Sequence, residues 1–229
     1  MIPLRDNLYS RNKPIVTWTL IALNVLIFFW DRQWSWSGMS VVFSDLVMRP
    51  TEVIRALHGN GDLLEVGKVF TSMWLHVNAM HLIGNMLFLF AFGENVEAAL
   101  GGLRFALYYL FWGIVAGATH VFVNPGSSAA TLGASGAIGG VLGCYFLLFP
   151  GNKVQIVVPP FIFWWFSIPA WILLGVWFLW QVALPQAGVA NWAHVGGFLA
   201  GMLTVLAAGG RDRLLKGSRF TRVALDDEI

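Results

Sequence analysis

Two short runs of small residues place a serine and a histidine where they could perform acyl-transfer chemistry. Ser135 lies in Gly133-Ala134-Ser135-Gly136, and His194 follows Ala193 in a second glycine-rich run. A serine hydroxyl is a weak nucleophile until a neighbouring base accepts its proton. A neutral histidine can accept that proton and later give it to the leaving group. Ser135 and His194 are therefore the candidate nucleophile and general base.

Two further polar residues, His81 and Asn85, could stabilise the negative charge that such a reaction develops. They are four residues apart, so on a helix they share one face, and both side chains can donate hydrogen bonds. The backbone amide of Ser135 lies where a helix is expected to begin, and such amides have no partner within the helix. These three groups are candidate donors to the oxyanion of a tetrahedral intermediate.

An acidic third member of the catalytic group is not apparent. Between Glu97 and Asp212 the chain contains no Asp or Glu, and Glu94 and Glu97 are expected at the opposite end of their helix. The sequence therefore favours a Ser-His dyad.

Metal and cofactor chemistry is not expected. No H-E-x-x-H motif is present, and His76 and His81, five residues apart, do not share a helix face. Gly-rich loops of the dinucleotide or P-loop type are also absent. We therefore predict no metal site and no cofactor.

The elements that carry these residues are expected to be transmembrane helices. The chain is 57% hydrophobic and 11% charged, whereas a soluble domain carries about 25% charged residues. A net charge of +2 without a basic stripe argues against binding to nucleic acid. We predict an all-α membrane protein, a bundle of six transmembrane helices. The expected spans are residues 15–30, 79–97, 103–123, 133–149, 161–182 and 189–208.

Lys and Arg residues predict how this bundle is oriented. Basic residues precede the first span and follow the last, so both termini are expected in the cytoplasm. Residues 1–210 would form the membrane domain, with an outer loop at 31–78, and residues 211–229 a short cytoplasmic tail. Spans two, four and six then begin near the outer face, and the four candidate residues lie roughly 5–12 Å below it.

Each of these residues also has a simpler interpretation. Gly136 and Gly140, like Gly197 and Gly201, form small-xxx-small pairs that let helices approach closely. Ser135 could then be a packing residue, and His194 and Asn85 could be polar contacts between helices. Four polar groups at one depth favour a catalytic site, because polar groups in a membrane are costly unless paired or functional. Close packing at the glycines would bring the serine and the histidine within hydrogen-bonding distance.

The combined motifs resemble those of the rhomboid intramembrane serine proteases. The likeness covers nearly the whole chain and rests on three motifs in order: His81-x-x-x-Asn85, Gly133-Ala134-Ser135-Gly136, and Ala193-His194 with Gly197 and Gly201. It implies that Ser135 is the nucleophile, His194 the base, and His81 and Asn85 oxyanion-hole donors.

The same resemblance carries expectations about substrate and location. It implies that the substrates are other membrane proteins, cut in or beside a transmembrane helix near the outer face. The fifth span would be a moving wall through which the substrate enters. The run from 76 to 97 looks like that of bacterial members. By the same resemblance, the short cytoplasmic ends without an extra domain imply a multi-pass protein of a bacterial plasma membrane. The sequence does not indicate the natural substrate or the oligomeric state.

Two positions depart from the pattern of some family members. A Trp-Arg pair is replaced by Gly67-Lys68, and lysine cannot reproduce the planar fork of arginine. An aromatic residue that stacks on the catalytic histidine is replaced by Gly139, so the orientation of His194 is open.

Two other classes of function compete with a protease. A non-catalytic rhomboid-like chaperone or scaffold is the main alternative, although inactive relatives lose the serine or the histidine and this chain keeps both. A transporter is less favoured, since spans two to six carry no central acid and no detectable repeat.

Overall fold

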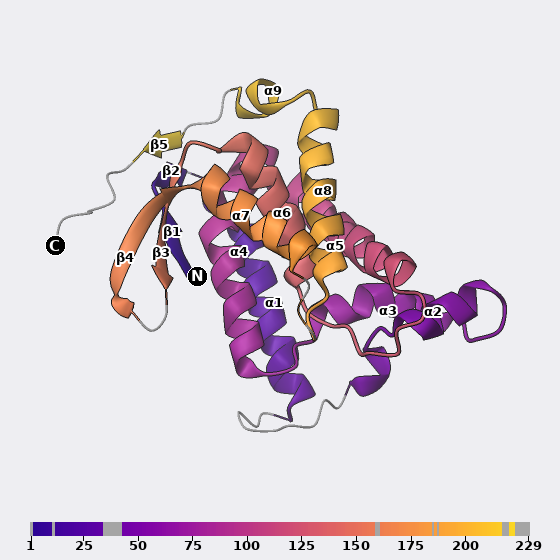
Figure 1. Ribbon diagram of the computed structural model, residues 1–229. Helices are drawn as coiled ribbons and strands as arrows, with labels where there is room; N and C mark the ends of the chain where they lie inside the picture. Colours follow the sequence, from indigo (N-terminus) through magenta and orange to yellow (C-terminus); the bar gives the residue numbers. More distant parts are fainter. Residues whose placement is uncertain are drawn as a thin grey trace.

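Helices dominate the computed structural model of the chain. It describes residues 2–10, 12–33, 43–158, 161–184, 186, 188–216 and 220–222. Within these residues, six helices of 14 to 22 residues form a bundle (Figure 1): α1 (Ile15–Asp31), α4 (Ala79–Leu100), α5 (Gly102–Val123), α6 (Ser135–Leu148), α7 (Ala170–Ala183) and α8 (Asn191–Ala207). Shorter helices follow α1 and α8: η1 (Ser44–Leu46), α2 (Pro50–Leu57), α3 (Leu64–Thr71), η2 (Ser72–Trp74) and α9 (Arg211–Leu215).

The expectation of an all-α fold is wrong in one respect, because the described part of the chain also contains five strands. They are β1 (Ile2–Asp6), β2 (Leu8–Ser10), β3 (Lys153–Val158), β4 (Phe161–Pro169) and β5 (Phe220–Arg222). One antiparallel sheet has the strand order β1-β3-β4, and β2 pairs with β5 in a second sheet.

The fifth predicted span is therefore only partly helical. It was expected to be a helix from residue 161, but the first nine residues form β4, paired with β3 from Lys153↔Pro169 onward. Aromatic and β-branched residues suit a strand. Pro169 has no backbone N–H for the middle of a helix, and it occupies the N-cap of α7, where that loss costs little. Helix α6 also starts at Ser135, two residues later than predicted.

The number of spans remains a prediction. Judged by length and composition, α5 is long and apolar enough to cross a bilayer, and a second crossing is possible if Leu64–Trp74 and Ala79–Leu100, bent by 77°, form one broken span. The other four long helices are apolar but have 14 to 17 residues. A helix of 14 residues is about 21 Å long, which is shorter than a hydrocarbon core of about 30 Å.

Loops from two parts of the chain meet at the end of the bundle where α4 and α6 begin. The Thr51 amide donates to the Ser127 carbonyl (3.0 Å), the Thr131 amide to Met48 (2.8 Å), and the Gly133 amide to Ser72 (3.0 Å). Lys68, in place of an expected arginine, pairs with Glu65 on α3 (2.6 Å). The 43–78 segment is thus fixed against the segment that leads into Ser135, while positions 34–42 of the predicted outer loop lie outside the described residues.

Helices α6 and α8 pack backbone against backbone. A Cβ atom built on Gly197 would lie 2.0 Å from the Gly136 carbonyl oxygen, and one on Gly201 would lie 1.9 Å from that of Gly140. No side chain fits at Gly197 or Gly201 unless the two helices separate. The small-xxx-small pairs therefore set the distance between the helices that carry the candidate serine and histidine.

Candidate active site

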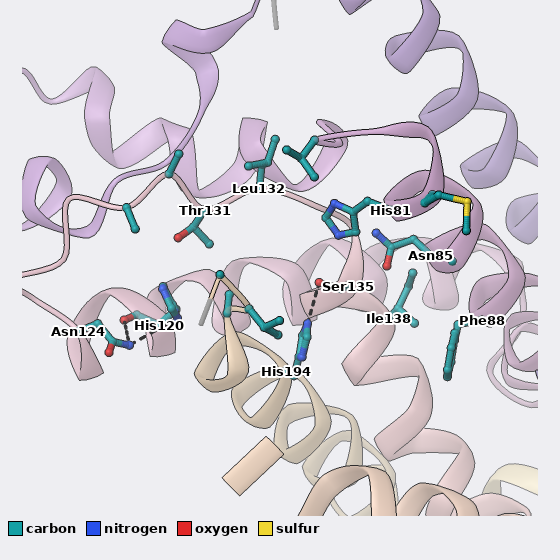
Figure 2. A pocket seen from close by; sticks show the side chains of 18 of the residues that line it. His81, Asn85, Phe88, His120, Asn124, Thr131, Leu132, Ser135, Ile138 and His194 are labelled. Carbon is teal, nitrogen blue, oxygen red and sulfur yellow. Dashed lines mark hydrogen bonds between the residues drawn. The ribbon is translucent and has the colours of Figure 1, made fainter. Parts of the chain in front are cut away.

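Ser135 and His194 face each other across the contact between α6 and α8. Ser135 is the first residue of α6, and His194 lies in the first turn of α8. His194 Nε2 lies 2.9 Å from Ser135 Oγ, a hydrogen-bonding distance that Figure 2 marks with a dashed line. The structure thus brings the predicted nucleophile and base together.

His81 and Asn85 reach the same place from α4. The side chain of Asn78 caps this helix by accepting a hydrogen bond from the His81 amide (2.8 Å), which puts His81 in the first turn. Both side chains point toward the Ser135 end of α6 in Figure 2. The Nδ2 group of Asn85 is buried and has no hydrogen-bond partner among the described residues. A buried donor without a partner is costly in a folded protein, so its retention suggests a ligand or reaction intermediate as its partner.

Gly133 keeps space open beside these donors. Its φ of +123° is a backbone conformation that residues with side chains rarely adopt. A Cβ atom there would lie 2.7 Å from His81 Cε1 and 3.6 Å from Asn85 Nδ2. The glycine therefore allows the turn before α6 and leaves the donor groups uncovered.

A cavity of about 660 Å³ opens onto the four predicted residues (Figure 2). Its wall also includes His120 and Asn124 from the end of α5, where Asn124 Nδ2 donates to the His120 carbonyl (3.1 Å). Most of the remaining wall is apolar, including Val77, Met80, Leu132, Ile138, Leu142 and Trp177. An apolar cavity with a few convergent polar groups is typical of a substrate site.

Helix α7 supplies two contacts to His194 that the sequence interpretation missed. Gln181 Oε1 lies 2.8 Å from His194 Nδ1, and the Trp177 ring lies beside the imidazole with centroids 5.6 Å apart. Gly139 has no room for an aromatic side chain, because its Cβ would lie 2.9 Å from the His194 carbonyl oxygen. In the apolar run 170–183, Gln181 is the one side chain other than tryptophan that can form hydrogen bonds. A polar residue in such a run is costly unless it is paired or functional, so the sequence could have indicated Gln181 as a site residue.

Glu97, which the sequence placed at the far end of its helix, caps α1. Its carboxylate accepts hydrogen bonds from the Val16 amide (3.0 Å), the Thr17 amide (2.7 Å) and the Thr17 hydroxyl (2.8 Å). Glu97 is 16 residues beyond His81 on α4, or about 24 Å along the helix. It therefore serves a helix N-terminus and not the Ser135 site.

Among the described residues, no group of three His, Cys, Asp or Glu side chains could hold a metal ion.

Comparison with known proteins gives the class to which this fold and site belong. The family model described as the Rhomboid domain matches residues 64–211, which include all four predicted site residues. The chain belongs to the rhomboid family, a family of helical integral membrane proteins, and the resemblance seen in its motifs is confirmed.

Three relatives illustrate the range of the family. Rhomboid protease GluP of Bacillus subtilis is 29% identical over 201 residues, which is 88% of this chain and 36% of that protein. Rhomboid protein 1, mitochondrial, of Saccharomyces cerevisiae is 34% identical over 59% of this chain and 40% of that protein. Rhomboid-type serine protease 2 of Emericella nidulans is 31% identical over 57% of this chain and 24% of its own length. The chain thus spans about a quarter to two fifths of the length of these relatives.

Proposed function

We propose that this chain is an intramembrane serine endopeptidase that uses a Ser135-His194 dyad. The observation that carries the proposal is the 2.9 Å contact between His194 Nε2 and Ser135 Oγ at the wall of the cavity. Membership of a family that includes named serine proteases supports it.

The proposed reaction follows from the positions of these groups. Ser135 Oγ attacks the carbonyl carbon of the scissile peptide while its proton moves to His194 Nε2. The carbonyl oxygen becomes an oxyanion that receives hydrogen bonds from Asn85, His81 and the Ser135 amide. His194 then protonates the leaving amine, and water releases the acyl group from Ser135 by the same steps in reverse.

The proposed substrates are transmembrane proteins that are cut in or beside a membrane helix. The apolar cavity wall and the membrane character of the family support this class of substrate. In this proposal α7 forms the wall through which the substrate enters, the site opens toward the outer face, and the protein lies in a bacterial plasma membrane. The bacterial location is suggested by the sequence likeness alone, since the relatives include bacterial and mitochondrial proteins.

The test is active-site labelling of the detergent-solubilised protein together with cleavage of a model transmembrane substrate. A fluorophosphonate should modify Ser135, as mapped by mass spectrometry. Ser135→Ala and His194→Ala should abolish both labelling and cleavage, because the hydroxyl and its base are both needed. His58→Ala, which alters an exposed histidine on the protein surface, is the matched control and should retain both.

Two results would reject the proposal. Cleavage that persists in purified Ser135→Ala would place the reaction elsewhere. A folded wild-type protein that binds the substrate helix without cutting it would favour the chaperone or scaffold function.

A further inference from the structure

A chain of four hydrogen-bonding contacts runs from a loop to the candidate nucleophile. The Gln186 amide donates to Asn191 Oδ1 (3.1 Å), and Asn191 Nδ2 donates to Gln181 Oε1 (2.9 Å). Gln181 Oε1 lies 2.8 Å from His194 Nδ1, and His194 Nε2 lies 2.9 Å from Ser135 Oγ. The chain connects the α7–α8 loop, α8, α7 and α6.

The direction of each contact follows from the first one. A backbone N–H can only donate, so the oxygen of Asn191 must face Gln186 and its nitrogen must face Gln181. That NH2 group needs an acceptor, so Gln181 must present its oxygen. An amide oxygen can only accept, so the proton of the neutral His194 ring must be on Nδ1. Nε2 is then left with a free lone pair directed at Ser135.

We infer that Gln181 is a positioning residue that holds His194 in the tautomer able to accept the Ser135 proton, with Asn191 fixing the orientation of Gln181. This inference rests on the proposed function. Gln181 and Asn191 are both buried, so water does not compete for the contacts between them. Trp177, one turn earlier on the same face of α7, confines the imidazole ring from the side.

A neutral amide suits this position because the site lies in a membrane protein. The orienting residue of a serine protease triad is an aspartate, which keeps the histidine in the correct tautomer and also stabilises its charged form. A buried carboxylate is costly at membrane depth, and between Glu97 and Asp212 the chain has no acid. Gln181 supplies the orienting hydrogen bond without a permanent charge.

The first experiment observes the tautomer directly and needs no catalytic activity. In ¹⁵N-histidine-labelled protein at neutral pH, NMR should show His194 with its proton on Nδ1, the resonance being assigned by its loss in His194→Ala. In Gln181→Met, which keeps a similar length but has no acceptor, the Nε2-protonated form should become populated. A wild-type His194 protonated on Nε2 would overturn the inference and leave the proposed function to its own labelling test.

The second experiment separates positioning from general packing. Gln181→Met should lower kcat by about 10–100-fold with little change in KM. Gln181→Glu should recover most of the activity, because a carboxylate accepts the same hydrogen bond. In this variant, the fall in activity at low pH should begin at a higher pH than in the wild type, because the added negative charge stabilises the protonated His194 ring. In the described part of the chain, the titratable groups that face His194 from other helices are His81 on α4 and His120 on α5, and both are unchanged in these variants.

Thr204→Val is the matched control for this comparison. It removes another buried hydrogen bond of α8, from Trp112 Nε1 to Thr204 Oγ1 (2.9 Å), away from the catalytic cavity. It should lower thermal stability but keep the wild-type kcat and pH profile. The positioning role is rejected if Gln181→Met keeps the wild-type kcat, or if Gln181→Glu is no more active than Gln181→Met.

Discussion

In the proposed mechanism, the Asn85 side chain donates a hydrogen bond to the oxyanion of the transition state. Its Nδ2 group is buried at the cavity wall without a partner among the described residues, close to the open space that Gly133 leaves. A donor that gains its partner only when an oxyanion forms stabilises the transition state more than the bound substrate. The effect of removing it should therefore appear in turnover more than in binding.

The prediction at the residue scale is that Asn85→Ala lowers kcat by about 10–10³-fold, with a smaller change in KM. Cleavage of a transmembrane substrate by the purified variant measures both constants. Asn95→Ala is the control, because Asn95 is also a buried asparagine of α4 but bonds to Asp6 and the Leu8 carbonyl. Unchanged turnover in a folded Asn85→Ala protein would leave Asn85 as a contact between helices.

At the scale of elements, the carboxyl group of Asp6 links the end of strand β1 to two helices of the bundle. Asp6 accepts hydrogen bonds from the Leu8 amide (3.1 Å), from Asn95 Nδ2 on α4 (2.7 Å) and from the Tyr145 hydroxyl on α6. Burial raises the pKa of Asp6 from 3.8 to about 6, although these hydrogen bonds act in the opposite direction. The Asp6 carboxyl group therefore binds its proton more tightly in the folded protein than in the unfolded chain.

This pKa predicts how Asp6 affects stability. Because the folded-state pKa is raised, the contribution of Asp6 is fully present below about pH 4 and is lost as the pH rises through about 6. The loss is at most about 3 kcal/mol, at about 1.4 kcal/mol per pKa unit. Asp6→Asn should remove this component, so wild type and variant should diverge between pH 4 and 7 in thermal unfolding.

The control for Asp6 is Asp212→Asn, which removes an exposed carboxyl group from α9. This variant should follow the pH dependence of the wild type. A constant difference between wild type and Asp6→Asn at every pH would mean that the carboxyl group does not titrate in this range.

At the scale of the whole molecule, the strands join residues 8–10 to residues 220–222. β2 pairs with β5, from Leu8↔Arg222 to Ser10↔Phe220, and β1 pairs with β3 from the α6–α7 connection (Figure 1). Strands β1, β2 and β5 and the α6–α7 connection thus lie at one end of the bundle. Helix α4 runs from the Ser135 site at its start to Asn95, which contacts β1, near its C-terminus.

The topology prediction follows from this arrangement and from the basic residues at both ends. A reporter fused to the C-terminus should lie in the cytoplasm, and one inserted at Gly61, in the exposed turn between α2 and α3, should lie outside. Compartment-specific reporter activity in cells measures each position. If both report the same side, the six-span arrangement is wrong.

The sequence alone determined where the candidate chemistry lies. Ser135, His194, His81 and Asn85 could be singled out because each is a polar residue near the start of an apolar segment, and the glycine pairs predicted that the helices pack closely. Local periodicity and composition carry this information. Five of the six predicted spans also match observed helices to within about three residues at each end, namely α1, α4, α5, α6 and α8.

Tertiary structure alone decided how His194 is held and where the fifth span begins. Gln181 meets His194 only because α7 turns this side chain toward α8, and a contact between residues 13 apart across a loop is not encoded in either local pattern. The run 161–169 is apolar and aromatic, so its composition fits a buried helix as well as a strand. Its partner β3, itself paired with β1, settles the choice, because a strand satisfies its backbone hydrogen bonds with a neighbouring strand and not within its own segment.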